Sequence, residues 1–112
     1  MYNYVAIMGR LTHNPQLSKT GEGVPVVSCR IAVDRNHSKK GEKRKTDFVN
    51  IVAWNLNAES IANHLTKNSM ILVEGRLRNK EYTDKNDKDR TISEVVVEKV
   101  HFMGDSNRKI EG

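Results

Sequence analysis

The stretch MILVEGRLRNKEY, residues 70–82, is the part of the sequence from which both the fold and the function are predicted. Read as a strand, it points successive side chains to opposite faces of a sheet. One face is apolar or small and consists of Ile71, Val73, Gly75 and Leu77. The other face consists of Glu74, Arg76, Arg78, Lys80 and Tyr82. Cations spaced about 7 Å apart that lead to an aromatic ring make a good track for a polyanion, although a solvated sheet face also fits the pattern.

Four further strands are predicted around this one. They cover residues 4–11, 24–35, 47–54 and 90–103. After residue 54 the apolar period becomes that of a helix, with one buried stripe made of Ala58, Ile61, Ala62 and Leu65. Asn57 is the expected N-cap of this helix, and Glu59 lies in its expected first turn. Residues 12–23, 36–46 and 83–89 have the composition of turns and loops.

The order of three strands, one short helix and two strands predicts an all-β OB-fold. This fold is a five-stranded Greek-key barrel, here with the helix between strands 3 and 4. We expect the five strands to be antiparallel. A split α+β sandwich is the structural competitor, but the single helix and the long strands favour the barrel.

The chain is basic, which suggests an acidic partner. It has 112 residues, with 19 Lys and Arg against 14 Asp and Glu, and a formal net charge of +5. One predicted loop and its border concentrate six cations: Arg35, Lys39, Lys40, Lys43, Arg44 and Lys45. Such a run is usually a solvated loop and matters for binding only where it borders a binding face.

The single cysteine and the hydropathy pattern bear on the compartment. Cys29 has no partner for an internal disulfide, which suits a reducing cytoplasm, and its place between Val27 and Ile31 on one strand face indicates a buried hydrophobic residue. No apolar run approaches the ~18 residues that span a bilayer, and the N-terminus lacks the pattern of a signal peptide. We therefore expect a cytoplasmic protein without membrane association.

Catalytic and metal chemistry is poorly supported. The run DKNDKD at 84–89 resembles a calcium loop, but two of its six positions are cations and no bidentate Glu follows at the twelfth position. The four histidines lie far apart in the sequence, so no zinc-ligand spacing exists. No P-loop or GxSxG motif occurs, and no carboxylate pair stands out. We expect no enzymatic activity, no cofactor and no metal.

Two aromatic residues on the third predicted strand favour nucleic-acid binding. Phe48 and Trp54 are six residues apart and therefore share a face, while the opposite face supplies its own core residues: Val49, Ile51 and Ala53. An aromatic pair on a strand is usually core, but this strand and residues 70–82 each offer a second, aromatic-bearing face. Bases stack on such rings regardless of sequence, so we expect weak sequence preference and weaker binding of duplex DNA, whose π-faces are hidden.

The sequence resembles the bacterial single-stranded DNA-binding protein family. The likeness is carried by MYNYVAIMGRLTHNPQL at the start, TDFVNIVAWNLNAESIANHLTKNSMILVEGRLRNKEYTD in the centre, and RTISEVVVEKVHFM at the close, together roughly residues 1–103. The resemblance implies an OB-fold over 1–103 that binds single strands in a groove lined by aromatics and cations, usually as a homotetramer. It also implies that the first strand, whose second face carries Tyr4, Ala6 and Met8, helps to build a dimer interface.

The resemblance assigns roles to individual positions. Phe48, Trp54 and Tyr82 match base-stacking aromatics of the family, and His37 falls where many members carry an aromatic, which makes its role weaker. The basic residues that the resemblance implies are Arg10, Arg35, Arg76 and Arg78. Lys80 joins them as a predicted DNA contact because it continues the cation track.

The C-terminal residues depart from the family pattern. Many members carry a long Gly- and Pro-rich linker and an acidic terminal peptide that recruits replication and repair enzymes, whereas residues 104–112 are a short polar tail, expected to be disordered. A tail-less member of the family explains this. Alternatively, the chain is truncated, because Ile-Glu-Gly at 110–112 is the start of a common engineered protease site. In either case this sequence predicts no tail-dependent recruitment.

The function predicted from these features is the coating of single-stranded DNA in replication, recombination or repair, in the cytoplasm at the nucleoid. Two alternatives remain open. An OB-fold adaptor in replication restart would use the same aromatics to dock proteins through salt-insensitive contacts. A cold-shock-type RNA binder would prefer RNA to DNA of equal sequence.

Overall fold

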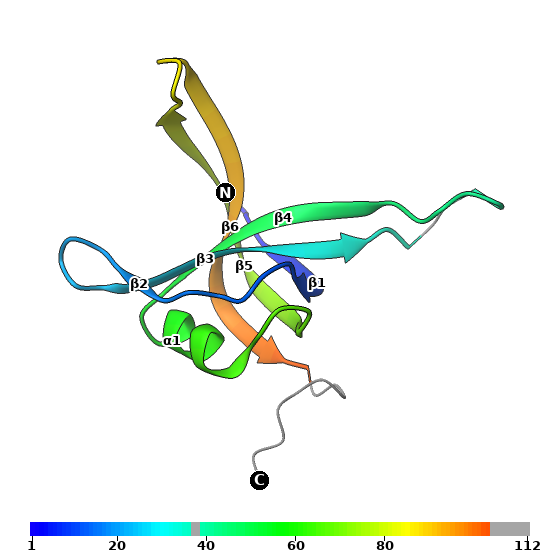
Figure 1. Cartoon of the computed structure of the whole chain (residues 1–112), viewed down its shortest axis with the longest axis horizontal. Helices are drawn as coiled ribbons and strands as arrows, with labels where there is room; N and C mark the ends of the chain where they lie inside the picture. The colour runs from blue at the N-terminus through cyan, green and yellow to red at the C-terminus, as the bar shows by residue number, and fades with distance from the viewer. Residues whose placement is uncertain (37–38, 104–112) are drawn as a thin grey trace, which may run out of the picture.

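The computed structural model of this chain describes residues 1–36 and 39–103, which form six strands and one helix (Figure 1). In chain order the elements are β1 (Val5–Leu11), β2 (Ser18–Lys19), β3 (Pro25–Asp34), β4 (Thr46–Trp54), α1 (Asn55–His64), β5 (Met70–Thr83) and β6 (Asp89–Phe102). The five predicted long strands and the helix are confirmed, while β2 is a short addition inside the predicted loop 12–23. The predicted tail, 104–112, lies outside the described residues.

The five long strands are joined in a closed ring of pairings. The sheet order is β1-β5-β6-β4-β3-β2, and β1 also pairs with β3 at Arg10↔Ala32 and Leu11↔Ile31. The prediction that all strands are antiparallel is wrong for one pair, because β4 and β6 are parallel. A ring with an odd number of strands cannot alternate direction at every step, so closure itself requires one parallel pairing.

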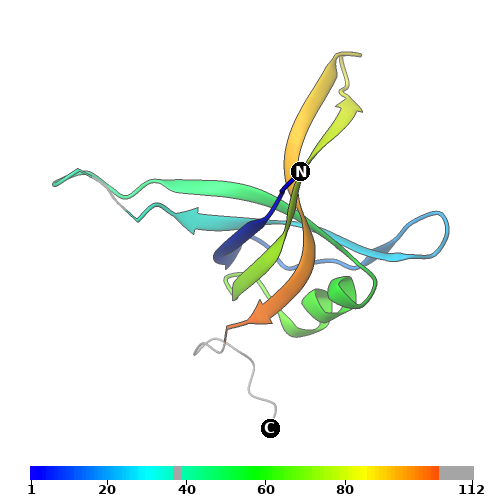
Figure 2. The ribbon, with the colours of Figure 1, turned by 180° about the vertical axis from the view of Figure 1, so that it is seen from behind.

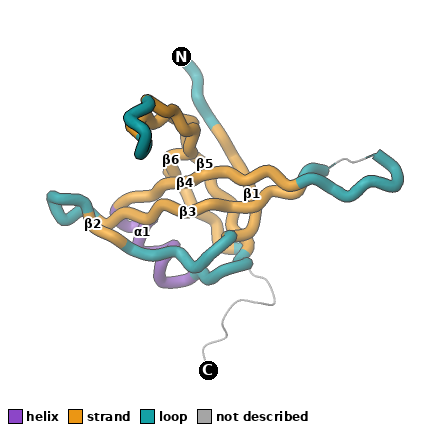
Figure 3. Tube along the Cα trace, turned by 45° about the horizontal axis from the view of Figure 1, so that its top comes forward, coloured by secondary structure: helices purple, strands orange, loops and turns teal. Residues whose placement is uncertain are grey.

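Two hairpins extend away from this ring, and the helix lies against it. In Figure 1 the β3–β4 hairpin points to the right and the β5–β6 hairpin points upward, and Figure 2 shows the same arrangement from behind. Helix α1 packs against β3, β4 and β6, on the side of the ring away from the tip of the β5–β6 hairpin. Figure 3 shows β3 and β4 side by side, with a loop at each end of the pair. No helix in the part of the chain that the structure describes is long and apolar enough to cross a membrane.

The interior is filled by the inward faces of the strands and by the helix. Its largest fully buried side chains are Leu11, Ile31, Ile51, Ile61, Ile71, Val27, Val73 and Val95. The predicted inward positions Ile51, Ala53, Ile71 and Val73 are therefore confirmed. Cys29 is also buried, as expected, and burial raises the pKa of its thiol to about 11.

The start of the helix was predicted three residues too late. Trp54 is the N-cap residue and the helix begins at Asn55, whose φ of 59° lets the chain turn directly out of β4. Asn57 is therefore already inside the first turn, and its side chain donates a hydrogen bond to the Glu98 carbonyl of β6 (3.2 Å). Glu59 lies beyond the first turn, so the predicted interaction with the helix dipole is wrong.

A register shift in the β5–β6 pairing corrects the predicted core face of residues 70–82. Glu74 pairs with Lys99 but Gly75 pairs with Val97, so Glu98 is an extra residue on β6. Beyond this bulge β5 no longer pairs with β1, and Leu77, predicted to face the core, is 49% exposed. On β6 the alternation of core-facing residues shifts by one as well: Val95 and Val97 face the core on one side of the bulge, and Val100 faces it on the other.

The bulge depends on a close approach that only glycine allows. A Cβ on Gly75 would lie 1.8 Å from the Val96 carbonyl oxygen and 2.9 Å from its carbonyl carbon. We predict that Gly75→Ala lowers the free energy of unfolding by about 1–3 kcal/mol, because backbone must move to admit the methyl group. Urea denaturation measures this change. The matched control is Gly21→Ala, since a Cβ there meets nothing within 4 Å; equal stability of the two variants would contradict the close packing.

Candidate nucleic-acid interface

The outward face of β4 carries the two aromatic residues. Phe48 is 61% exposed and Trp54 is half-buried, while Ile51 and Ala53 of the same strand point into the core. The register places Phe48 opposite Ala32 and Trp54 opposite Val26 of β3. Both aromatic side chains therefore lie on the outside of the ring, and each is at least partly exposed to solvent.

The strand pairing brings the predicted cations to the same outward face. Asn50 pairs with Glu94 of β6, and Glu94 pairs with Arg78 of β5, so these three residues form one row across the sheet. On the other side of β4, Arg10 pairs with Ala32, which in turn pairs with Phe48. The aromatics of β4 thus have arginines on both sides. We call this surface, which runs over β3, β4, β6 and β5, the outer face.

Two predicted phosphate-binding arginines are ion-paired with carboxylates that sequence reasoning missed. Arg76 Nε lies 2.9 Å from Glu98 Oε2, and both side chains are about half exposed. Arg78 Nε donates to Glu94 Oε2 (3.0 Å), and its Nη2 contacts the same oxygen. A signal existed in the alternation of the β6 sequence, which places Glu94 and Glu98 on one face. Their pairing with the cations depends on the register of the hairpin.

Arg78 also contacts Trp54. Its guanidinium carbon lies 5.1 Å from the centroid of the indole ring, within the range of a cation–π interaction. Glu94, which is only 8% exposed, holds the guanidinium from β6. The three side chains form a chain of contacts that fixes the orientation of the Trp54 ring.

Three of the remaining predicted residues, Arg35, Lys80 and Tyr82, lie on the two hairpins. Lys80 and Tyr82 are exposed on the part of β5 that projects from the ring, and Lys80 makes no ion pair within the part of the chain described here. At the base of the basic loop, two Arg35 nitrogens bond the Asp47 carboxylate (3.0 and 3.1 Å), and this holds the pKa of Asp47 below its usual range. His37 lies outside the described residues. Arg10 Nη1 donates to the Asn68 carbonyl at 3.0 Å.

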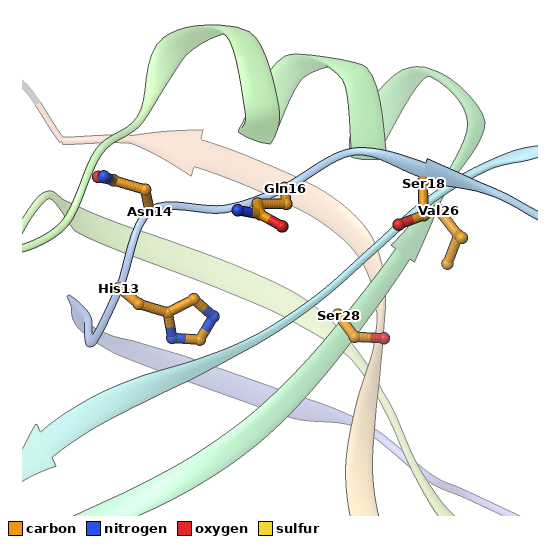
Figure 4. A pocket seen from close by; sticks show the side chains of 6 residues that line it. All are labelled: His13, Asn14, Gln16, Ser18, Val26 and Ser28. Atoms are coloured by element: carbon orange, nitrogen blue, oxygen red, sulfur yellow. The ribbon is translucent and has the colours of Figure 1, made fainter.

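A polar groove next to Trp54 was not predicted. It has a volume of ≈ 530 Å³ and is lined by His13, Asn14, Gln16, Ser18, Val26 and Ser28 (Figure 4). The first four come from the chain after β1 and from β2, and the last two come from β3. Val26 and Ser28 are opposite Trp54 and Val52, so the groove is continuous with the outer face. Residues 12–23 were interpreted only as turns, and only their polar composition hinted at a site.

A separate cluster of hydrogen-bonded side chains lies where β5 pairs with β1 and β6, before the bulge at Gly75. The Tyr4 hydroxyl donates to the Glu74 carboxylate, which also lies 2.5 Å from His101 Nε2. These hydrogen bonds, that of Tyr4 first, lower the pKa of Glu74. Tyr4 is exposed, as is Met8 on the same face of the first strand. These two residues belong to the surface for which the sequence predicts self-association.

Comparison with known proteins bears on this geometry. The model of the "single-strand binding protein family" matches residues 2–103. The chain is 40% identical to single-stranded DNA-binding protein 2 of Listeria monocytogenes over 112 residues, which cover 100% of this chain and 70% of that protein. It is 39% identical to the single-stranded DNA-binding protein of Clostridium tetani over 111 residues, 98% of this chain and 76% of the relative.

A third relative is matched over less of its own length. The single-stranded DNA-binding protein of Oceanobacillus iheyensis is 39% identical over 103 residues, which are 92% of this chain and 64% of that protein. The family match confirms the resemblance and the predicted OB-fold, which agrees with the closed ring of pairings and the helix between β4 and β5. By its sequence over residues 2–103 and by its fold, the chain belongs to the single-strand binding protein family.

Proposed function

We propose that this protein binds and protects single-stranded DNA, largely independently of sequence and without a catalytic step. The observation that carries the proposal is the exposure of Phe48 on the same outward sheet face as Trp54, with arginines on both sides of that face. Stacking of a base on such a ring is worth about 1–3 kcal/mol and accepts every base. Membership of the family and the names of the relatives support the same function.

The cations divide into two groups in this proposal. Lys80 and the basic loop offer charges to phosphates directly, together with Arg10. Arg76, Arg78 and Arg35 are engaged by carboxylates, so a phosphate has to compete for them. Tyr82 extends the stacking surface along the hairpin, and His37 is proposed as a further contact on the basic loop.

The assembly and the cellular role belong to the proposal as well. On one side of β1, residues 5–9 pair with β5. On its other side, β1 pairs with β3 only at Arg10 and Leu11, so most of this second edge of β1 is unpaired among the described residues. We propose that this edge and the exposed Tyr4 and Met8 serve in a homotetramer. The protein would act in replication, recombination and repair in the cytoplasm, at the nucleoid.

The first prediction from this proposal concerns Trp54, the only tryptophan of the chain. We expect a long oligothymidine to quench its fluorescence strongly and duplex DNA to quench it little, because only the single strand offers free π-faces. Affinity should fall with salt, with a slope of roughly −0.7 per neutralised phosphate. Absence of quenching and of binding at low salt would favour the protein adaptor, and tighter binding of RNA of equal sequence would favour the cold-shock-type reader.

The second prediction concerns Phe48. We expect Phe48→Ala to weaken binding of oligothymidine by about 1–3 kcal/mol, since one stacking ring is lost from an exposed position that does not support the core. Leu56→Ala is the matched control, because Leu56 is also a large exposed apolar residue, 76% exposed, but lies on α1. Equal affinities of the two variants in the same titration would remove Phe48 from the site.

The third prediction tests the competition between carboxylate and phosphate. Glu98→Gln removes the charge that engages Arg76 and keeps the shape of the side chain. We expect DNA binding to tighten by up to about fivefold at low salt, because an exposed ion pair is worth roughly 0–1 kcal/mol. The control is Glu22→Gln, which makes the same change in net charge on an exposed loop. If both variants tighten binding equally, the effect comes from the change in net charge, and Glu98 does not compete with phosphates for Arg76.

A further inference from the structure

The polar groove beside Trp54 has no role in the function described above. We propose that it binds the hydrogen-bonding edge of a nucleobase from the same strand that stacks on Trp54. The inference rests on the proposed single-strand binding and adds recognition of base edges to it. It also adds to the expectation from sequence, which based weak sequence preference on stacking alone.

The position of the groove fits the path of a strand over the outer face. Val26 is paired with Trp54, and adjacent strands lie only about 4.8 Å apart. A base that stacks on the indole therefore places its neighbour along the strand within reach of β3 and of the segment that crosses it (Figure 4). The volume of ≈ 530 Å³ lies within the range of roughly 300–1,000 Å³ typical of pockets for small ligands.

The chemistry of the lining selects the ligand class. Five of the six lining residues are polar: His13, Asn14, Gln16, Ser18 and Ser28. None of the six is Lys, Arg, Asp or Glu, so the groove lacks the cations that a phosphate needs. An apolar ligand would leave many polar groups unpaired. A neutral, planar, hydrogen-bonding heterocycle is the component of a nucleic acid that fits these properties.

Hydrogen bonds at the start of the groove hold two of its side chains. The Thr12 hydroxyl lies 3.2 Å from the Arg30 carbonyl oxygen and 3.0 Å from His13 Nδ1, so the imidazole is held through Nδ1 and its Nε2 is left for a ligand. Asn14 Oδ1 accepts from the Lys67 backbone N–H (2.7 Å), which leaves its NH₂ group as a donor.

The same hydrogen bonds hold the segment in place before a ligand arrives. Thr12 N–H donates to the Arg30 carbonyl (3.0 Å), Asn68 N–H donates to the Leu11 carbonyl (2.9 Å), and Pro15 is buried beneath the segment. By contrast, the side chains of Gln16, Ser18 and Ser28 make no hydrogen bond within residues 1–36 and 39–103. An imidazole held through Nδ1, a fixed amide donor and three adaptable groups match the alternating donors and acceptors on every base edge.

The test compares oligothymidine with an oligomer of N3-methylthymidine of equal length, in which stacking is retained but the N3–H donor is blocked. Wild-type protein is compared with the Gln16→Ala/Ser28→Ala variant, whose two side chains are exposed and support no other contact. We expect methylation to weaken wild-type binding by about threefold to tenfold. The double variant should bind oligothymidine about as weakly as the wild type binds the methylated oligomer. Methylation of the oligomer should then lower the affinity of the variant little further. Quenching of Trp54 at saturation should be the same in all cases.

Other outcomes overturn the inference in distinguishable ways. Equal loss on methylation in both proteins places the sensitive contact outside the groove, and no loss in either shows that base edges are not bound. If neither oligomer binds or quenches Trp54, the proposed function fails, and the inference with it. The control is Asn63→Ala, which removes an exposed amide from α1 outside the groove lining and should leave both affinities as in the wild type.

Discussion

The pairing of β5 with β6 is the contact on which both the core and the outer face depend. It runs from Ile71↔Phe102 to Thr83↔Asp89 with one shift at Glu74/Gly75. On one side of the shift β5 contributes Ile71 and Val73 to the interior, and on the other side it projects from the ring. The approach of Gly75 to the Val96 carbonyl permits this change, so the bulge separates the part of β5 that contributes to the core from the part that carries cations and Tyr82.

The features that could be predicted from sequence are those set by local alternation. Ile51 and Ile71 were placed inward correctly, because a strand buried on one face shows its period in its own residues. The bulge could not be found in this way, since the extra residue, Glu98, is defined only by pairing with another strand. Leu77 was therefore assigned to the core. The early start of α1 depends on the left-handed conformation of Asn55, which composition alone does not determine.

The same distinction applies to the site. Phe48 and Trp54 are predicted as stacking residues because their own strand has a separate buried face. The groove was missed because its walls meet through contacts between distant parts of the chain, such as Asn14 with Lys67. The carboxylates were missed for a related reason. They come from β6, and only the register shows that Glu94 and Glu98 lie beside the arginines of β5.

These carboxylates raise the question of why a face for a polyanion should contain acids. Arginines two residues apart on one strand repel each other, and an acid on the neighbouring strand offsets this repulsion when no DNA is bound. The two pairs differ in exposure, however. The Arg76–Glu98 pair is about half exposed, so a phosphate can replace Glu98 at little cost. Glu94 is buried, and taking Arg78 from it would leave an uncompensated charge in the sheet. We therefore propose that Arg78 acts mainly by holding Trp54 in position, and we expect the number of phosphates neutralised to be smaller than the number of arginines on the outer face.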